Sequence, residues 1–67
     1  MNLYTIRKKY KPGTILTPIK YTNTPQDVGK KFIVKDIYIP FTGHLLLNCI
    51  DDGREIIWHY SQLRVIE

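Results

Sequence analysis

The hydrophobic and polar positions of this chain alternate or form short apolar runs, and both patterns are typical of β-strands. The clearest case is a pair of apolar-rich segments, residues 44–50 and 54–60, which flank Asp52-Gly53. Aspartate-glycine between two such runs is a strong hairpin signal, because a type I′ turn requires positive φ at both central residues. The sequence therefore predicts a β-hairpin that is closed by a two-residue turn.

The predicted turn determines which side chains share a face of the hairpin. With Asp52 and Gly53 as the turn, Leu47 lies opposite Trp58, and alternation collects apolar and aromatic side chains on one face. The single tryptophan is therefore expected to face the core. Because the domain is thin, the edge of its indole can still lie at the rim and form part of a binding groove. The predicted core face of the hairpin consists of Leu45, Leu47, Cys49, Ile56, Trp58 and Tyr60.

Residues 31–39 form another predicted strand, and its apolar phase shifts midway. The apolar residues on the two sides of Lys35-Asp36 fall on opposite faces of an ideal strand; they are Phe32 and Val34 before it and Ile37 and Ile39 after it. A β-bulge restores a common apolar face, because it places two residues of one strand opposite one of its partner. We therefore predict a bulge or a sharp bend near this dipeptide.

Two further strands are predicted from shorter segments. Residues 14–21 are rich in β-branched side chains, and Pro18 within them suits an edge strand or a bulge because proline has no amide hydrogen. Residues 60–63 favour a single 3₁₀ turn, which leads into a last short strand at residues 64–66.

The basic N-terminal segment, residues 1–11, is expected to be a lead-in that forms a frayed arm or an edge strand. The domain itself is expected to span residues 12–67. No apolar period near 3.6 residues extends over three turns with caps at both ends, so little helix is predicted.

Composition narrows the class of protein. A chain of 67 residues allows one domain, whose thin core buries about 60% of the surface of the unfolded chain. Cys49 is the single cysteine, so no intramolecular disulfide is available, as in proteins of a reducing compartment. The apolar runs are too short to cross a bilayer, and the N-terminal residues lack a signal-peptide pattern. We expect a soluble cytoplasmic protein that does not bind membranes.

The charge of the chain is unevenly distributed. Residues 1–35 hold eight basic residues and one acid, a balance of +7, whereas residues 36–67 hold two arginines and five acids, a balance of −3. The basic half is either a solvated face or a surface for an anionic partner, which would be a nucleic acid or an acidic protein. The candidate binding residues, which combine cations with tyrosines, are Tyr4, Arg7, Lys8, Lys9, Tyr10, Lys11, Lys30 and Lys31.

Catalytic and metal-binding chemistry is not expected. In the predicted hairpin Cys49 lies on the apolar face while His44 and His59 lie on the other, so these ligands do not converge on a zinc ion. Ser61 is two residues from His59, but no third group is placed to orient the imidazole. The chain also has no glycine-rich phosphate loop. We therefore expect no cofactor, no small-molecule substrate and no enzymatic activity.

The order of the predicted elements resembles the SH3-like small β-barrel, in which a long hairpin is followed by a 3₁₀ turn and a short closing strand. Residues 59–66 match that order and length. More narrowly, the sequence VGKK at residues 28–31, the later acid-glycine turn and Leu63 are similar to small phage and prophage proteins of the YorP type. The resemblance implies an all-β, five-stranded barrel. The composition, rich in Lys, Ile, Asn and Tyr, also fits an AT-rich phage genome.

Two functions follow from these patterns. The first is a non-catalytic module that binds a protein partner through a tyrosine-rich or edge-strand surface, such as a phage effector that engages a host enzyme in the bacterial cytoplasm. The alternative is a nucleic-acid-binding module that uses the basic N-terminal half. Peptide-binding members of the fold carry several acids in their first long loop, whereas residues 22–29 hold only Asp27, so proline-rich peptides are not the expected ligand.

Overall fold

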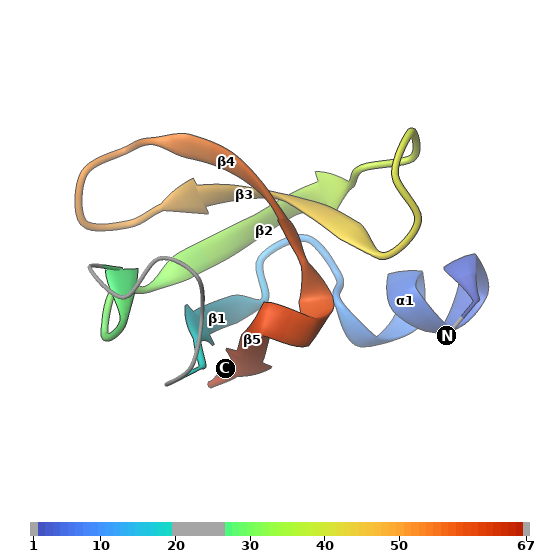
Figure 1. The fold of residues 1–67 in the computed structure, drawn as a ribbon, viewed down its shortest axis with the longest axis horizontal. Coiled ribbons are helices and arrows are strands. Elements are labelled where there is room, and N and C mark those ends of the chain that lie inside the picture. Colours follow the sequence, from blue (N-terminus) through green and yellow to red (C-terminus); the bar gives the residue numbers. More distant parts are fainter. Residues whose placement is uncertain (1, 20–26, 67) are drawn as a thin grey trace.

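The computed structural model describes residues 2–19 and 27–66, and it is mostly β (Figure 1). Five antiparallel strands form one sheet in the order β4-β3-β2-β1-β5, and no pairing among the described residues joins its two edges. The all-β prediction is thus correct at the level of the sheet, with one short helix added. The elements are α1 (Leu3–Lys9), β1 (Ile15–Pro18), β2 (Phe32–Ile37), β3 (His44–Cys49), β4 (Glu55–His59), the 3₁₀ turn η2 (Tyr60–Gln62) and β5 (Leu63–Val65).

The β3–β4 hairpin forms as predicted, but its turn is longer. Leu45 rather than Leu47 lies opposite Trp58, because the loop holds the four residues 50–53. The Cys49 amide donates to the Arg54 carbonyl at 2.7 Å and closes this loop. A type I′ turn at Asp52-Gly53 is therefore wrong: no non-glycine residue among those described has positive φ. Only the glycine of this loop does, at 77°.

The predicted bulge in β2 is confirmed. Pairing with β3 shifts register between Val34 and Asp36, which leaves Lys35 as the extra residue. As a result Phe32, Val34 and Ile37 are all buried on one side of the sheet. Ile39 does not follow them, because β2 ends before it and its side chain is 57% exposed.

The proline in β1 lies where the strand is locally an edge. The β1–β2 pairing runs from Ile15↔Ile33 to Leu16↔Phe32 and then stops; continued, it would place Pro18 opposite Lys30. The Lys30 carbonyl instead accepts a hydrogen bond from the Thr17 hydroxyl at 2.8 Å. A side-chain donor thus replaces the amide that proline lacks, which explains how proline is tolerated in a strand with neighbours on both sides.

A helix occupies part of the segment that was expected to be an arm or an edge strand. Helix α1 begins after Asn2, whose side chain accepts the Thr5 amide at 2.9 Å as an N-cap. The residues with i, i+3, i+7 spacing, Leu3, Ile6 and Tyr10, lie on one side of the helix. Ile6 and Tyr10 are buried against the sheet, so tertiary packing holds a helix too short to be stable alone.

The core lies between the inner face of the sheet and α1. Leu45, Leu47 and Cys49 of β3 are fully buried, while Ile56, Trp58 and Tyr60 are half-buried and pack against them. The structure therefore places the six hairpin residues on one face, with those of β3 at its centre. The buried hydrophobic residues are Ile6, Tyr10, Leu16, Phe32, Val34, Ile37, Leu45, Leu47, Cys49 and Leu63.

Candidate functional site

The predicted basic surface divides into two parts at opposite ends of the molecule. Arg7, Lys8 and Lys9 are exposed in the last turn of α1, and Lys11 follows them. Lys30 and Lys31 precede β2 instead. Figure 1 shows α1 with the β2–β3 loop at one end, while the start of β2 and the β3–β4 loop lie at the other.

The two tyrosines of the predicted surface have different environments. Tyr4 is 75% exposed, so its ring is accessible on α1. Tyr10 is buried at 5% exposure, where its ring meets the edge of Tyr60 with centroids 6.0 Å apart. Assigning Tyr10 to a binding surface was therefore wrong, and its role is to anchor the end of α1 to the core. The Lys9 ammonium lies 5.5 Å from the Tyr10 ring centroid, a cation–π distance.

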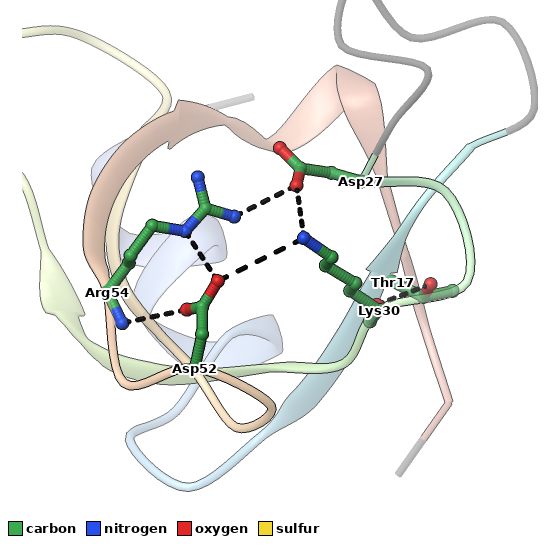
Figure 2. Close-up of polar contacts among 5 residues, drawn as sticks. All are labelled: Thr17, Asp27, Lys30, Asp52 and Arg54. Atoms are coloured by element: carbon green, nitrogen blue, oxygen red, sulfur yellow. Dashed lines mark hydrogen bonds and ion pairs between the residues drawn. The ribbon is translucent and has the colours of Figure 1, made fainter.

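Lys30 belongs to a compact charge cluster rather than to an open basic surface (Figure 2). The Asp27 carboxylate, which is 2% exposed, accepts from Arg54 at 2.9 Å and lies 3.3 Å from the Lys30 ammonium. Asp52 pairs with Arg54 at 2.8 Å and lies 3.9 Å from Lys30. Two acids and two bases balance, so this cluster ties the segment before β2 to the β3–β4 loop and leaves no net charge for a ligand.

The hydrogen bonds of the cluster shift the pKa values of two of its members. The pKa of Asp52 is lowered, mainly because its carboxylate accepts the Arg54 backbone amide at 3.0 Å. The pKa of the Arg54 guanidinium is raised, first by its hydrogen bond to Asp27 and then by that to Asp52. Both shifts favour the charged forms, as expected of paired groups.

The cations of α1 have no acidic partner in the part of the chain that the structure describes. Among residues 2–19 and 27–66, ion pairs use Lys30, Lys35 and Arg54 as cations, and none involves α1 or Lys11. The first turn of the helix has no acidic residue, while its last turn carries three bases. As far as the described residues go, this end of the molecule therefore holds concentrated positive charge that no acid compensates.

An apolar pocket opens beside α1, between the helix and the end of the β2–β3 hairpin. Its volume of about 110 Å³ is below the 300–1,000 Å³ or so that drug-sized ligands occupy, so it fits a side chain rather than a cofactor. Large apolar side chains stand exposed around it, at 46% for Leu3, 57% for Ile39 and 56% for Phe41. The lining residues are Leu3, Ile6, Ile37, Tyr38, Ile39, Phe41, Thr42 and Gly43.

A row of aromatic rings supports the loop that lines the pocket. The Phe41 ring contacts Tyr38 on one side and His44 on the other, with centroids 5.4 and 5.5 Å apart. The row continues from His44 to His59 at 5.1 Å. Gly43 permits this packing, because a Cβ there would lie 2.5 Å from the His59 ring. The pocket rim is thus held by packed rings rather than by a free loop.

The histidines form hydrogen bonds that are structural in kind. Nδ1 of His59 caps η2 by accepting the Ser61 amide at 3.1 Å, and it also lies 2.8 Å from the Ser61 hydroxyl. His44 Nδ1 lies 3.2 Å from the Thr42 carbonyl. Within the described part of the chain, no three or more His, Cys, Asp or Glu side chains are grouped so as to hold a metal ion. No helix in that part is both long and apolar enough to span a membrane.

The candidate site is the end of the molecule that holds both the pocket and α1. The cations of this helix do not line the pocket itself. We define the α1 surface as the pocket with Leu3, Tyr4, Ile39 and Phe41 and the cations Arg7, Lys8, Lys9 and Lys11. Sequence reasoning found the cations and Tyr4 but missed the apolar members. Ile39 and Phe41 flank Pro40, and apolar residues on both sides of a turn proline were the available signal.

Comparisons of the chain with protein-family models, with curated proteins and with solved structures found no match. The α1 surface therefore has to be interpreted from its own chemistry.

Proposed function

We propose that the protein is a non-catalytic interaction module whose α1 surface binds an acidic segment of a protein partner. One observation carries the proposal: an apolar pocket with exposed Ile39 and Phe41 lies beside a helix whose cations have no acidic partner among the described residues. Apolar anchors in a pocket supply most of the affinity of an interface. Charges around the anchor accelerate association and select the partner.

The dimensions of the pocket favour a peptide segment over a small molecule. About 110 Å³ accommodates one apolar side chain, while the surrounding Leu3, Ile39 and Phe41 offer further contact area. A segment with one aromatic or aliphatic anchor and acidic residues nearby matches both features. Binding of this kind needs neither a cofactor nor a catalytic group.

The strand order and η2 support the further proposal that the fold is an SH3-like barrel. A hairpin, a 3₁₀ turn and a short strand that returns to β1 follow one another as that fold requires. The resemblance of VGKK at residues 28–31 to YorP-type phage proteins, which rests on the sequence alone, makes proteins of a bacterial host, enzymes included, the first class of partner to test.

Nucleic acid is the alternative partner, favoured by one observation. Tyr4, 75% exposed, stands on the same helix as three cations, a combination that stacks on bases while it neutralises phosphates. The apolar pocket has no role in this alternative, so variants of Ile39 distinguish the two partners.

The test is a pull-down from nuclease-treated bacterial lysate with paired variants. Ile39→Asp alters the α1 surface, and Ile50→Asp is its matched control, because Ile50 is 51% exposed at the opposite end of β3. Lys8→Glu and Lys31→Glu form a second pair of exposed lysines. We expect a stoichiometric protein to be retained by the wild type and both controls and to be lost with Ile39→Asp and Lys8→Glu.

A retained protein that is indifferent to Ile39→Asp would contradict the proposal. A mobility-shift titration with mixed-sequence DNA and RNA at two salt concentrations tests the alternative. Binding that weakens steeply with salt, falls with Lys8→Glu and ignores Ile39→Asp would establish nucleic acid as the partner.

A further inference from the structure

The outer edge of β4 presents backbone groups that no described residue pairs with. Within residues 2–19 and 27–66, β4 is the last strand of the sheet, and only β3 lies beside it. Along the hairpin the Cys49 amide bonds the Arg54 carbonyl and the Tyr60 amide bonds the Gly43 carbonyl. Alternation therefore turns the amides and carbonyls of Glu55, Ile57 and His59 away from β3.

This edge has few of the features that usually prevent strand addition, because its one charged residue, Glu55, lies at the end of the strand and is paired with Lys35. Residues Glu55–His59 include no proline, no lysine and no bulge. Ile57, at the centre of the strand, is β-branched and 40% exposed. The other edge, β5, is only three residues long and carries Arg64, and short charged edges are protected. β4 is thus the edge suited to pairing.

We infer that two copies of this chain associate by antiparallel pairing of β4 with β4 of the second copy. A two-fold axis at Ile57 places it opposite its own equivalent and places Glu55 opposite His59 of the other copy. All three outward-facing residues of each strand then form hydrogen-bonded pairs with the other copy. A shift of the second strand by two residues still sets outward-facing residues against one another but leaves fewer of them paired. The arrangement is symmetric, and the isoleucine pair lies at its centre.

The side chains at this edge are compatible with the pairing. The Glu55 carboxylate bonds the Lys35 ammonium of its own copy through Oε2 at 2.6 Å. His59 uses Nδ1 to cap η2 and packs its Nε2 side against Gly43, where a Cβ would lie 2.5 Å from that nitrogen. Both side chains keep these contacts when the two strands pair, so the pairing rests on the backbone hydrogen bonds. The ion pair with Lys35 is exposed and does not need to break.

Dimerisation leaves the α1 surface free. No residue of β4 lines the apolar pocket, so the dimer would carry two copies of the surface that we propose as a binding site. A partner with two acidic segments would then gain avidity. The dimer itself does not depend on the proposed function and is tested without a partner.

The experiment is sedimentation velocity of synthetic chains between about 10 μM and about 1 mM. The test chain carries an N-methyl group on the Ile57 amide, which removes an outward donor and keeps the side chain. Its matched control carries the same group on Val65. Val65 is 42% exposed on β5, and its amide also points outward, because the Ile66 amide bonds Ile15 in β1.

We expect the wild type and the Val65 control to form dimers, and the Ile57 chain to associate at least about tenfold more weakly with an unchanged circular dichroism spectrum. In a mixed-isotope sample, contacts between Glu55 of one copy and His59 of the other should report the register. A wild type that stays monomeric over the whole range would overturn the inference. A dimer that survives methylation of Ile57, or that is lost on methylation of Val65, would overturn it as well.

Discussion

The indole of Trp58 meets the Phe32 ring edge-on, with ring centroids 5.6 Å apart and planes at 88°. Phe32 is fully buried at the start of β2, whereas the tryptophan is half-buried on β4. The contact therefore joins the outer strand of the sheet to the core, in one of the geometries that aromatic pairs prefer.

Replacement of Trp58 by alanine should lower the free energy of unfolding by about 3 kcal/mol, the lower end of the range for large aromatic core residues because this one is only half-buried. Ile50→Ala is the control on the same hairpin, since its side chain is 51% exposed, and it should cost less than about 0.5 kcal/mol. Urea denaturation followed by circular dichroism measures both. Equal stability of the two variants would show that Trp58 does not support the core.

Gly43 is predicted to tolerate alanine poorly because of its contact with His59. A Cβ would lie 2.5 Å from Nε2 of that ring, and φ at this glycine is +80°. Gly13 has φ of +96° and open space around it, so Gly13→Ala should cost only the left-handed penalty of about 1 to 2 kcal/mol.

The difference in unfolding free energy between the two glycine variants measures the cost of the clash between the new Cβ and the His59 ring. Gly43→Ala should unfold at a lower denaturant concentration than Gly13→Ala. In a His59→Ala background the gap should shrink, because the obstructing ring is gone. If the gap is unchanged in that background, the His59 contact is not its cause.

The faces of the hairpin were predictable even though its turn was not. A strand repeats every two residues, so the shift from Leu47 to Leu45 opposite Trp58 left every side chain on its predicted face. The β2 bulge was predictable for a related reason, since Val34 and Ile37 reach the same face only with an extra residue between them. The turn was missed because Asp52 uses its carboxylate to accept the Arg54 amide instead of adopting positive φ.

The candidate site was less predictable because it depends on α1 and on contacts that are distant in sequence. Leu3, Ile6 and Tyr10 have helical spacing, but two turns fall short of the length at which such a pattern is informative. The distribution of charge along the sequence also placed Lys30 in the same predicted binding surface as the cations of α1. Only tertiary structure shows that Asp27 and Asp52 neutralise that lysine.

Thr17→Val should destabilise the protein although it preserves shape. The Thr17 side chain is buried at 5% exposure. Its hydroxyl donates to the Lys30 carbonyl, to which Pro18 has no amide hydrogen to donate. Loss of that donor leaves a part-buried carbonyl unpaired, at a cost of about 1 to 3 kcal/mol. Thr17→Ser keeps the hydroxyl and should be closer to wild type in thermal denaturation. A valine variant as stable as the serine variant would contradict this role.

Asp52 should make stability depend on pH in the acid range. Its pKa is lowered from 3.8 in the folded protein, chiefly by the hydrogen bond from the Arg54 amide, so the folded state binds fewer protons than the unfolded chain there. The contribution of Asp52 to the free energy of unfolding is therefore fully present above the ordinary pKa of 3.8, which the group has in the unfolded chain. This contribution is lost as the pH falls through the lower pKa of the folded state. Urea midpoints from pH 5 to pH 2 should show a flatter decline for Asp52→Asn. Asp51→Asn removes the same charge from the same exposed loop and leaves the hydrogen bond from the Arg54 amide to Asp52 in place, so it controls for the loss of loop charge.

Asn2 should control whether the α1 surface is formed at all. Its side chain accepts the Thr5 amide at 2.9 Å, and the helix that it caps has only seven residues. Removal of an N-cap costs about 1 kcal/mol, a large share of the stability of so short a helix. Asn2→Ala should therefore speed hydrogen exchange at the Ile6 and Tyr10 amides, which donate within this helical turn, while exchange in β3 is unchanged. Asn2→Asp retains an acceptor and should protect both amides as the wild type does; if it exchanges as fast as the alanine variant, the cap is not what holds the helix.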